Sequence, residues 1–107
     1  MREVDLAVLA SELANGAFVI DVREPEEYQA GHVPGAHLVS LSTLDAAVSA
    51  LPEGRTVYVI CASGNRSGRA VEHLEALGVD AASVAGGTAA WAWAGRPIDR
   101  GAAAKAA

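Results

Sequence analysis

The stretch that decides the fold spans residues 56–67 and reads TVYVICASGNRS. Its first five residues are β-branched or apolar throughout, and continuous rather than alternating apolarity is typical of a strand covered on both faces, as in a parallel sheet. Residues 61–67 are small or polar, and they connect this strand to a helix predicted over 67–77, which Gly78 ends. A buried strand, a polar loop and a helix in succession indicate an α/β domain.

The rest of the chain repeats this alternation on both sides of the stretch. Further strands are predicted at 18–22, 36–39 and, more weakly, 82–84. Further helices are predicted from an Asp5 cap to Gly16, at 25–30 with Pro25 in the first turn, from a Ser42 or Thr43 cap to residue 51, and at 88–94. Strands that alternate with helices predict a three-layer α/β/α domain with a mostly parallel sheet.

Length and charge narrow the class of protein. A chain of 107 residues, 51% of them hydrophobic and 20% charged, fits one packed domain, which we place at residues 1–100. The Ala-rich tail 101–107 is expected to be frayed or disordered. A net charge of −5 argues against a nucleic-acid or anionic-membrane surface. No apolar run reaches the roughly 20 residues of a membrane span, and no secretory signal is apparent, so a cytoplasmic location is expected.

Cysteine and histidine usage is sparse. Cys61 is the one cysteine in the chain, so neither an internal disulfide nor a cysteine-based metal cluster can form. His32, His37 and His73 lack the spacing of metal ligands. We therefore expect no metal and no cofactor.

Cys61 itself is the strongest functional candidate. It follows a buried strand and precedes a helix, where the helix dipole and free main-chain N–H groups favour negative charge. Arg66 adds a cation, and Gly64 and Asn65 suit the positive φ angles of a loop that turns its N–H groups inward. Such surroundings lower a thiol pKa, and the thiolate is the nucleophile. A lone cysteine is more often an inert core residue, but these polar neighbours favour a reactive one.

Other polar residues are expected at the same edge of the sheet. Asp21 would bind loop N–H groups or arginine side chains, and Arg23 would pair with Glu27 or Glu24. A network that only stabilises the fold is the favoured reading of this group, since a carboxylate beside the sulfur would oppose the thiolate. Two further roles stay open. Ser67 could cap the following helix, donate a hydrogen bond to the sulfur, or do both, and Trp93 could lie on the surface or at the rim of an acceptor site.

Taken together, four segments give the chain a specific resemblance. They are 20–28 (IDVREPEEY), 31–36 (GHVPGA), 61–67 (CASGNRS) and 86–97 (GGTAAWAWAGRP). In this order and spacing the chain resembles the rhodanese family. The resemblance implies a five-stranded α/β domain in which Cys61 takes a sulfane sulfur from a donor such as thiosulfate and holds it as a persulfide. It further implies transfer to cyanide, or to a thiol or another nucleophile.

The loop length separates this chemistry from a related one. Related cell-cycle phosphatases and arsenate reductases place five residues between cysteine and arginine, whereas four separate Cys61 from Arg66, and Ser67 stands at the arginine position. A shorter loop makes a smaller cradle, which suits a sulfur atom better than a tetrahedral phosphate. Arg69 should lie one turn into the helix and does not replace that arginine. A phosphatase or arsenate reductase therefore ranks below a sulfurtransferase.

The site predicted for sulfur transfer is the loop that carries the cysteine. Cys61 is the expected catalytic residue, and the expected substrate-binding residues are Ala62, Ser63, Gly64, Asn65, Arg66 and Ser67. Arg66 and the loop amides would hold the sulfonate of thiosulfate. Without a second cysteine the persulfide must pass to an outside thiol, such as glutathione or a thioredoxin-like protein. A persulfide carrier that serves a partner protein, with little turnover of its own, is the alternative. The sulfurtransferase mechanism requires that the Cys61 side chain is not packed away in the interior.

Overall fold

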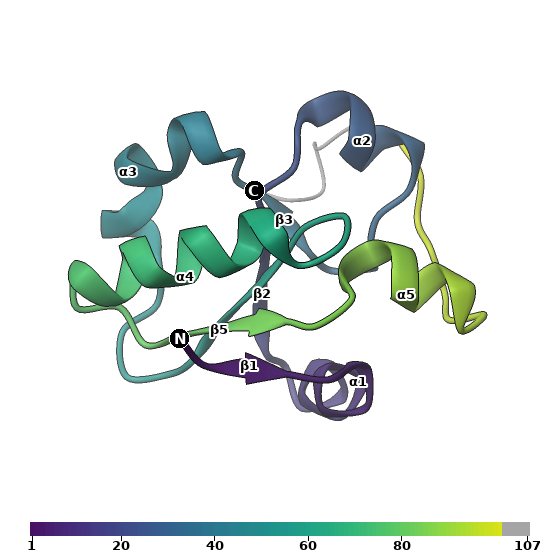
Figure 1. Cartoon of the computed structure of the whole chain (residues 1–107), viewed down its shortest axis with the longest axis horizontal. Helices are drawn as coiled ribbons and strands as arrows, with labels where there is room; N and C mark the ends of the chain where they lie inside the picture. Colours follow the sequence, from purple (N-terminus) through teal and green to yellow (C-terminus); the bar gives the residue numbers. More distant parts are fainter. Residues whose placement is uncertain (102–107) are drawn as a thin grey trace.

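A computed structural model describes residues 1–101 and confirms the α/β class. Its sheet has five strands, all parallel, in the order β1-β5-β4-β2-β3 (Figure 1). The strands are β1 (Glu3–Val4), β2 (Phe18–Asp21), β3 (His37–Leu38), β4 (Val57–Ile60) and β5 (Ala81–Val84). The helices are α1 (Leu6–Ala14), α2 (Pro25–Ala30), α3 (Leu44–Ala47), α4 (Asn65–Ala76) and α5 (Gly87–Trp93), with 3₁₀ turns η1 (Leu41–Thr43) and η2 (Val48–Ala50).

Two hydrophobic clusters cover the two faces of the sheet. On one face, Val57 and Val59 of β4 pack with Val71 and Leu74 of α4. On the other face, alternate strand residues such as Tyr58 and Ile60 pack with α1 and α5, which contribute Leu9 and Trp91. Because successive strand residues point to opposite faces, β4 is buried along its whole length, as its continuous apolarity predicted.

The edge strand β1 could not be recognised from its own residues. It is two residues long, its Glu3 is exposed, and it is held by pairing with Ser83 and Val84 of β5. Neither an apolar run nor an alternating pattern marks so short a strand. The rhodanese resemblance implied a five-stranded sheet, and the structure confirms that number.

The segment between β3 and β4 differs from the single capped helix predicted there. It consists of η1, α3 and η2 in succession, and no side chain caps any of them. The Thr43 hydroxyl, one of the two predicted caps, donates instead to the Ser40 carbonyl behind it (3.0 Å). The Thr43 hydroxyl is therefore turned toward the backbone that precedes it and accepts from no N–H group of α3.

The parallel arrangement brings the carboxyl ends of the central strands to one edge. Asp21 at the end of β2 lies in register with Ile60 at the end of β4, so Arg23 and Cys61 follow at the same edge. The predicted tail, 101–107, lies outside the described residues except for Gly101, whose N–H donates to the Gln29 carbonyl (3.0 Å). Among residues 1–101, no helix has the length and apolarity to cross a membrane.

Candidate active site

The sulfur of Cys61 lies directly after β4, under the loop that leads into α4. The Gly64 N–H donates to Sγ at 3.1 Å, and the Ser67 hydroxyl oxygen lies 3.4 Å from Sγ. Contrary to the expectation of a side chain that is not packed in the interior, Cys61 is only 1% exposed, and it belongs to the apolar cluster between the sheet and α4. The sulfur therefore has polar contacts on its loop side and apolar contacts beneath it.

These contacts decide the ionisation of the thiol. Burial is the largest single influence and raises the pKa of Cys61, because it disfavours the charged form. The Ser67 hydroxyl and the main-chain N–H groups of Ser67, Gly64 and Ser63 act in the opposite direction, since they donate to the thiolate. Together they outweigh burial, and the pKa of the Cys61 thiol lies below its ordinary value.

Positive φ angles were predicted at two positions of the loop, and the structure has one of them. Gly64 has φ +111°, a conformation that an L-residue rarely adopts, and it precedes the first residue of α4. Asn65 is already helical, so its predicted positive φ is wrong. The helix begins two residues before the predicted start, which puts Ser67 inside the first turn. Ser67 is therefore not a helix cap, and its hydroxyl is directed at the Gly64 carbonyl (3.1 Å) and the sulfur.

The first turn of α5 holds the base of the Cys61 loop. The N–H groups of Thr88 and Ala89 donate to the carbonyls of Cys61 and Ala62, at 2.8 and 2.9 Å. Gly87 makes this approach possible, because a Cβ at that position would lie 2.5 Å from the Cys61 carbonyl oxygen. This contact gives the Gly86-Gly87 pair, noted in the sequence only as part of a resemblance, a physical role at the site.

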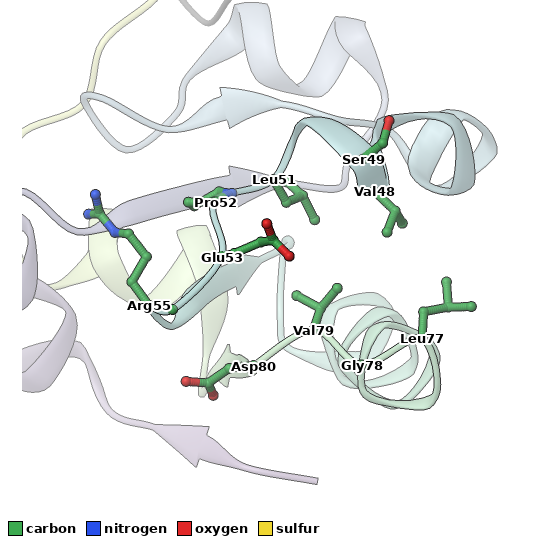
Figure 2. A pocket seen from close by; sticks show the side chains of 11 residues that line it. Val48, Ser49, Leu51, Pro52, Glu53, Arg55, Leu77, Gly78, Val79 and Asp80 are labelled. Carbon is green, nitrogen blue, oxygen red and sulfur yellow. The ribbon is translucent and has the colours of Figure 1, made fainter.

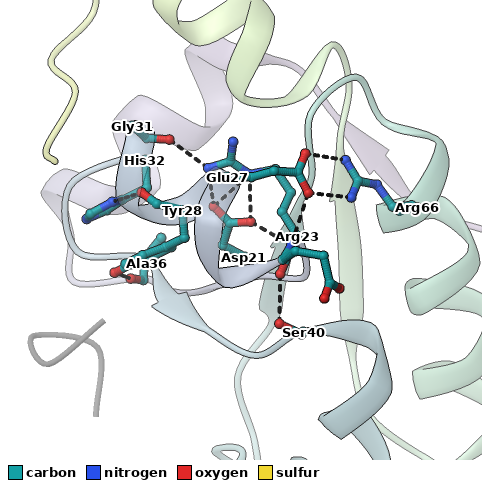
Figure 3. A network of polar contacts seen from close by, with 10 residues as sticks. Asp21, Arg23, Glu27, Tyr28, Gly31, His32, Ala36, Ser40 and Arg66 are labelled. Carbon is teal, nitrogen blue, oxygen red and sulfur yellow. Dashed lines mark hydrogen bonds and ion pairs between the residues drawn. The ribbon is translucent and has the colours of Figure 1, made fainter. Parts of the chain in front are cut away.

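Arg66 makes a bidentate ion pair with Glu27 of α2, at 2.7 and 2.9 Å (Figure 3). The Arg66 guanidinium lowers the pKa of Glu27 from 4.5 to about 2, and Glu27 raises the pKa of Arg66 in turn. Both side chains are about one-third exposed. Arg66 was predicted to face an anionic donor, and the structure shows that two of its N–H groups are already bound.

Asp21 and Arg23 form a separate buried ion pair (Figure 3). The Asp21 carboxylate accepts from Arg23 Nε and from a terminal guanidinium nitrogen, at 2.8 to 3.2 Å, and from the Arg23 main-chain N–H. The same guanidinium donates to the Gly31 carbonyl (2.7 Å). The predicted pairing of Arg23 with Glu27 or Glu24 is therefore wrong. Asp21, two residues away, captures the guanidinium, and Glu27 binds Arg66 instead.

Two further residues have structural roles. His32 stacks on Tyr28, with ring centroids 3.6 Å apart, and its Nδ1 lies 2.7 Å from the Tyr28 carbonyl. Because a carbonyl can only accept, Nδ1 carries the proton, and the histidine ties the end of α2 to the turn that follows. Trp91 is buried in the core, whereas Trp93 is 92% exposed.

A cleft of about 530 Å³ lies at the opposite edge of the sheet (Figure 2). It is lined by residues 48–49, 51–55 and 77–80, which precede β4 and β5 rather than follow them. It contains neither Cys61 nor any histidine. Among residues 1–101, no three His, Cys, Asp or Glu side chains come together as a metal site requires.

Of the residues predicted for the site, the structure brings Gly64 and Ser67 to the sulfur, with a contribution from the Ser63 N–H. Ser63 and Asn65 are exposed, and Ala62 is partly buried beside them. The sequence did not reveal Ser83 of β5, whose hydroxyl lies 2.7 Å from that of Ser67. The strand over 82–84 was predicted only weakly, and nothing in its three residues indicates a partner in α4.

Comparison with known proteins shows which proteins this chain resembles. An uncharacterized protein of Synechocystis sp. is 37% identical over 84 residues, which are 78% of this chain and 47% of that protein. The chain spans about half the length of the curated relatives that it matches here.

Two solved structures share the fold at higher coverage of this chain. A rhodanese-related protein from Thermoplasma volcanium has a TM-score of 0.86 and 34% identity, over 92% of this chain and 98% of its own. The thiosulfate sulfurtransferase of Pseudomonas aeruginosa has a TM-score of 0.84 and 32% identity, over 94% of this chain but 19% of its own. The sequence pattern of the rhodanese-like domain matches residues 5–94, and the chain therefore belongs to the rhodanese-like domain family.

Proposed function

We propose that this chain is a sulfurtransferase that carries a sulfane sulfur on Cys61 as a persulfide. The observation that carries the proposal is the contact of Sγ with the Gly64 N–H and the Ser67 hydroxyl. These donors favour the thiolate despite burial, and a thiolate at the carboxyl end of a parallel strand is placed as a nucleophile.

The first half-reaction loads the sulfur. The Cys61 thiolate attacks the outer sulfur of thiosulfate, a new S–S bond forms, and the bond to the sulfonate sulfur breaks with its electron pair on sulfite. Arg66 has five N–H groups and gives two to Glu27, so three remain for the anionic donor. In the second half-reaction an acceptor thiolate, such as glutathione or a thioredoxin-like protein, takes the outer sulfur, and Cys61 leaves as the thiolate.

Because Cys61 Sγ is buried, this chemistry requires that the sulfur becomes accessible to the donor. Cys61 is 1% exposed, but Ser63 and Asn65, which follow it in the chain, are exposed. A donor would reach Sγ when the loop over residues 62–64 shifts outward, without movement of β4. Once loaded, the outer sulfur would extend beyond Sγ toward the loop. A cytoplasmic setting, in which acceptor thiols stay reduced, suits this reaction.

Burial also favours the alternative that the chain is a persulfide carrier for a partner protein. A covered sulfur protects a persulfide from loss to small thiols and slows turnover with free thiosulfate. The two functions differ in steady-state conversion of thiosulfate and cyanide to thiocyanate. Rapid Cys61-dependent turnover supports the enzyme, whereas stable loading without turnover supports the carrier.

Mass spectrometry of the intact protein tests the shared step. After incubation with thiosulfate, we expect a mass gain of one sulfur atom, which cyanide or dithiothreitol removes. Cys61→Ser should show no gain, and Ser49→Ala, at the far edge of the sheet, should load like the wild type. A failure of the wild-type protein to gain sulfur from thiosulfate or from a persulfide donor would falsify both functions.

A further inference from the structure

Ser83 is a buried polar residue that the proposed chemistry does not yet use. It lies on β5, is 0% exposed, and places its Oγ 2.7 Å from Oγ of Ser67 on α4, which is also 0% exposed. Ser67 Oγ in turn lies 3.4 Å from Cys61 Sγ and 3.1 Å from the Gly64 carbonyl oxygen. The three side chains form a row from the sheet to the sulfur.

Counting protons gives this row a direction. Each hydroxyl has one proton to donate, and a thiolate or a carbonyl can only accept. If Ser67 donated to Ser83, neither the sulfur nor the Gly64 carbonyl would receive its proton. Within residues 1–101, the structure gives Ser83 Oγ one hydrogen-bond partner, Ser67 Oγ. If the fully buried Ser83 hydroxyl did not donate to Ser67 Oγ, its proton would have no acceptor, which costs free energy of folding. Donation from Ser83 to Ser67 satisfies both groups.

We propose that Ser83 is a positioning residue that donates to Ser67 and so directs the Ser67 proton onto the ionised sulfur of Cys61. When Cys61 is a neutral thiol, its S–H donates to Ser67 Oγ. On ionisation the Ser67 hydroxyl turns to donate to Sγ, and the Ser83 proton then satisfies the Ser67 oxygen. Hydrogen bonds in a chain polarise one another, so a Ser67 hydroxyl that accepts from Ser83 donates more strongly.

Other charged groups near the sulfur come from three elements. Arg66 of α4 interacts electrostatically with Cys61, and Glu27 of α2 is bound to Arg66. Asp21 and Arg23, at the end of β2, are bound to each other. In the described part of the chain, no hydrogen bond or ion pair joins these four residues to Ser83. Removing the Ser83 hydroxyl therefore leaves the ion pairs in place. The substitution isolates the effect of the hydrogen-bond relay from Ser83 through Ser67 to Cys61.

The test is a titration of the Cys61 thiolate by its ultraviolet absorbance, made possible by the single cysteine. Both substitutions should raise the pKa of the Cys61 thiol. Ser83→Ala should lower the acid dissociation constant of the thiol by about threefold, and Ser67→Ala should lower the same constant by about tenfold or more. Because Ser83 acts through Ser67, the double variant should titrate like Ser67→Ala alone. Ser40→Ala removes another buried hydroxyl, which donates to the Arg23 carbonyl, and should titrate like the wild type.

Two outcomes overturn the relay. One is a Ser83→Ala pKa equal to that of the wild type. The other is effects of Ser67→Ala and Ser83→Ala that simply add, since a merely structural role for Ser83 would not depend on Ser67. If Ser83→Ala fails to fold, Ser83→Thr and Ser83→Val make a pair of equal shape. We then expect a lower pKa in the threonine variant, and equal values reject the relay.

The relay rests on the proposed function for its biological meaning, but its test does not require sulfur transfer. A shifted pKa in Ser83→Ala together with a wild-type protein that never gains sulfur would leave the relay standing and reject the sulfurtransferase. If the wild-type protein gains sulfur but Ser83→Ala leaves the thiol pKa unshifted, the relay is rejected and the sulfurtransferase stands.

Discussion

Arg66 follows the candidate nucleophile by five residues, yet its guanidinium is bound in bidentate fashion by Glu27, 39 positions earlier in the chain. The pair joins the Cys61 loop to α2, so the cation nearest in sequence to the sulfur is partly neutralised. We therefore expect this ion pair to limit the affinity of the proposed site for anions.

Glu27→Gln should improve the use of an anionic donor. The change removes a negative charge next to the guanidinium and leaves Arg66 in place, so the KM for thiosulfate should fall by roughly fivefold. Steady-state rates at varied thiosulfate concentration measure it. Glu26→Gln, an exposed neighbour on α2 with the same change in charge, is the control and should change KM little. A higher KM for Glu27→Gln would mean that Glu27 orients Arg66 for the donor rather than competing with it.

Glu27 should also make stability depend on pH in acid. Its pKa is about 2 in the folded protein, against an ordinary value of 4.5. A lowered folded pKa contributes stability above about pH 4.5 and loses it as the pH falls from about 4.5 toward about 2. Other carboxylates titrate in the same range. The measurement is therefore the difference in urea midpoint between wild type and Glu27→Gln, which should shrink as the pH falls through this window and stay constant above it.

Asp21→Asn should destabilise the fold strongly. The substitution leaves the buried Arg23 guanidinium without its counter-charge, and breaking a buried pair costs about 3–5 kcal/mol. Asp80→Asn removes one partner of the exposed pair with Arg2 and should cost at most about 1 kcal/mol. Urea unfolding of the two variants gives both values. Similar costs would show that the Asp21–Arg23 pair contributes no more than a surface contact.

Gly87→Ala should displace the Cys61 loop. Gly87 has φ +59°, and a Cβ there would lie 2.5 Å from the Cys61 carbonyl oxygen and 2.6 Å from that of Ala62. We expect a loss of at least about 3 kcal/mol and a changed thiol pKa. Gly54→Ala also has a positive φ, +74°, but its Cβ would meet no atom within 4 Å, so it should cost about 1 kcal/mol and leave the thiol unchanged. Equal losses would count against the steric argument.

What the sequence predicted, and what it did not, follows from the range of each interaction. The strand at 56–60 and the helix at 25–30 were predicted because their signals, continuous apolarity and a Pro–Gly boundary, lie within the segment. The edge strand Glu3–Val4 exists only through its pairing with β5, and no local pattern marks it.

The same distinction holds at the site. The contact between Cys61 and Gly64 spans three residues, and the polar loop predicted it. The partner of Arg66 is 39 residues away and that of Ser67 is 16 residues away, and both depend on how α2 and β5 pack. The sequence contains several carboxylates and hydroxyls that could bind Arg66 and Ser67. Only the three-dimensional fold shows that the partners are Glu27 and Ser83.

Cys61 directly follows β4, the strand that lies between β5 and β2 in the sheet, and it precedes an exposed loop. These two segments open to solvent by different motions. Amide protons in a central strand exchange with solvent only when the whole domain unfolds, whereas those of an exposed loop exchange through small local excursions. We therefore expect Cys61, the residue proposed to react with a donor, to follow one of the slowest-exchanging segments of the molecule and to be covered by one of the fastest-exchanging. Deuterium uptake at residues 63–65 should report how often the sulfur is uncovered, on a timescale far shorter than that of unfolding.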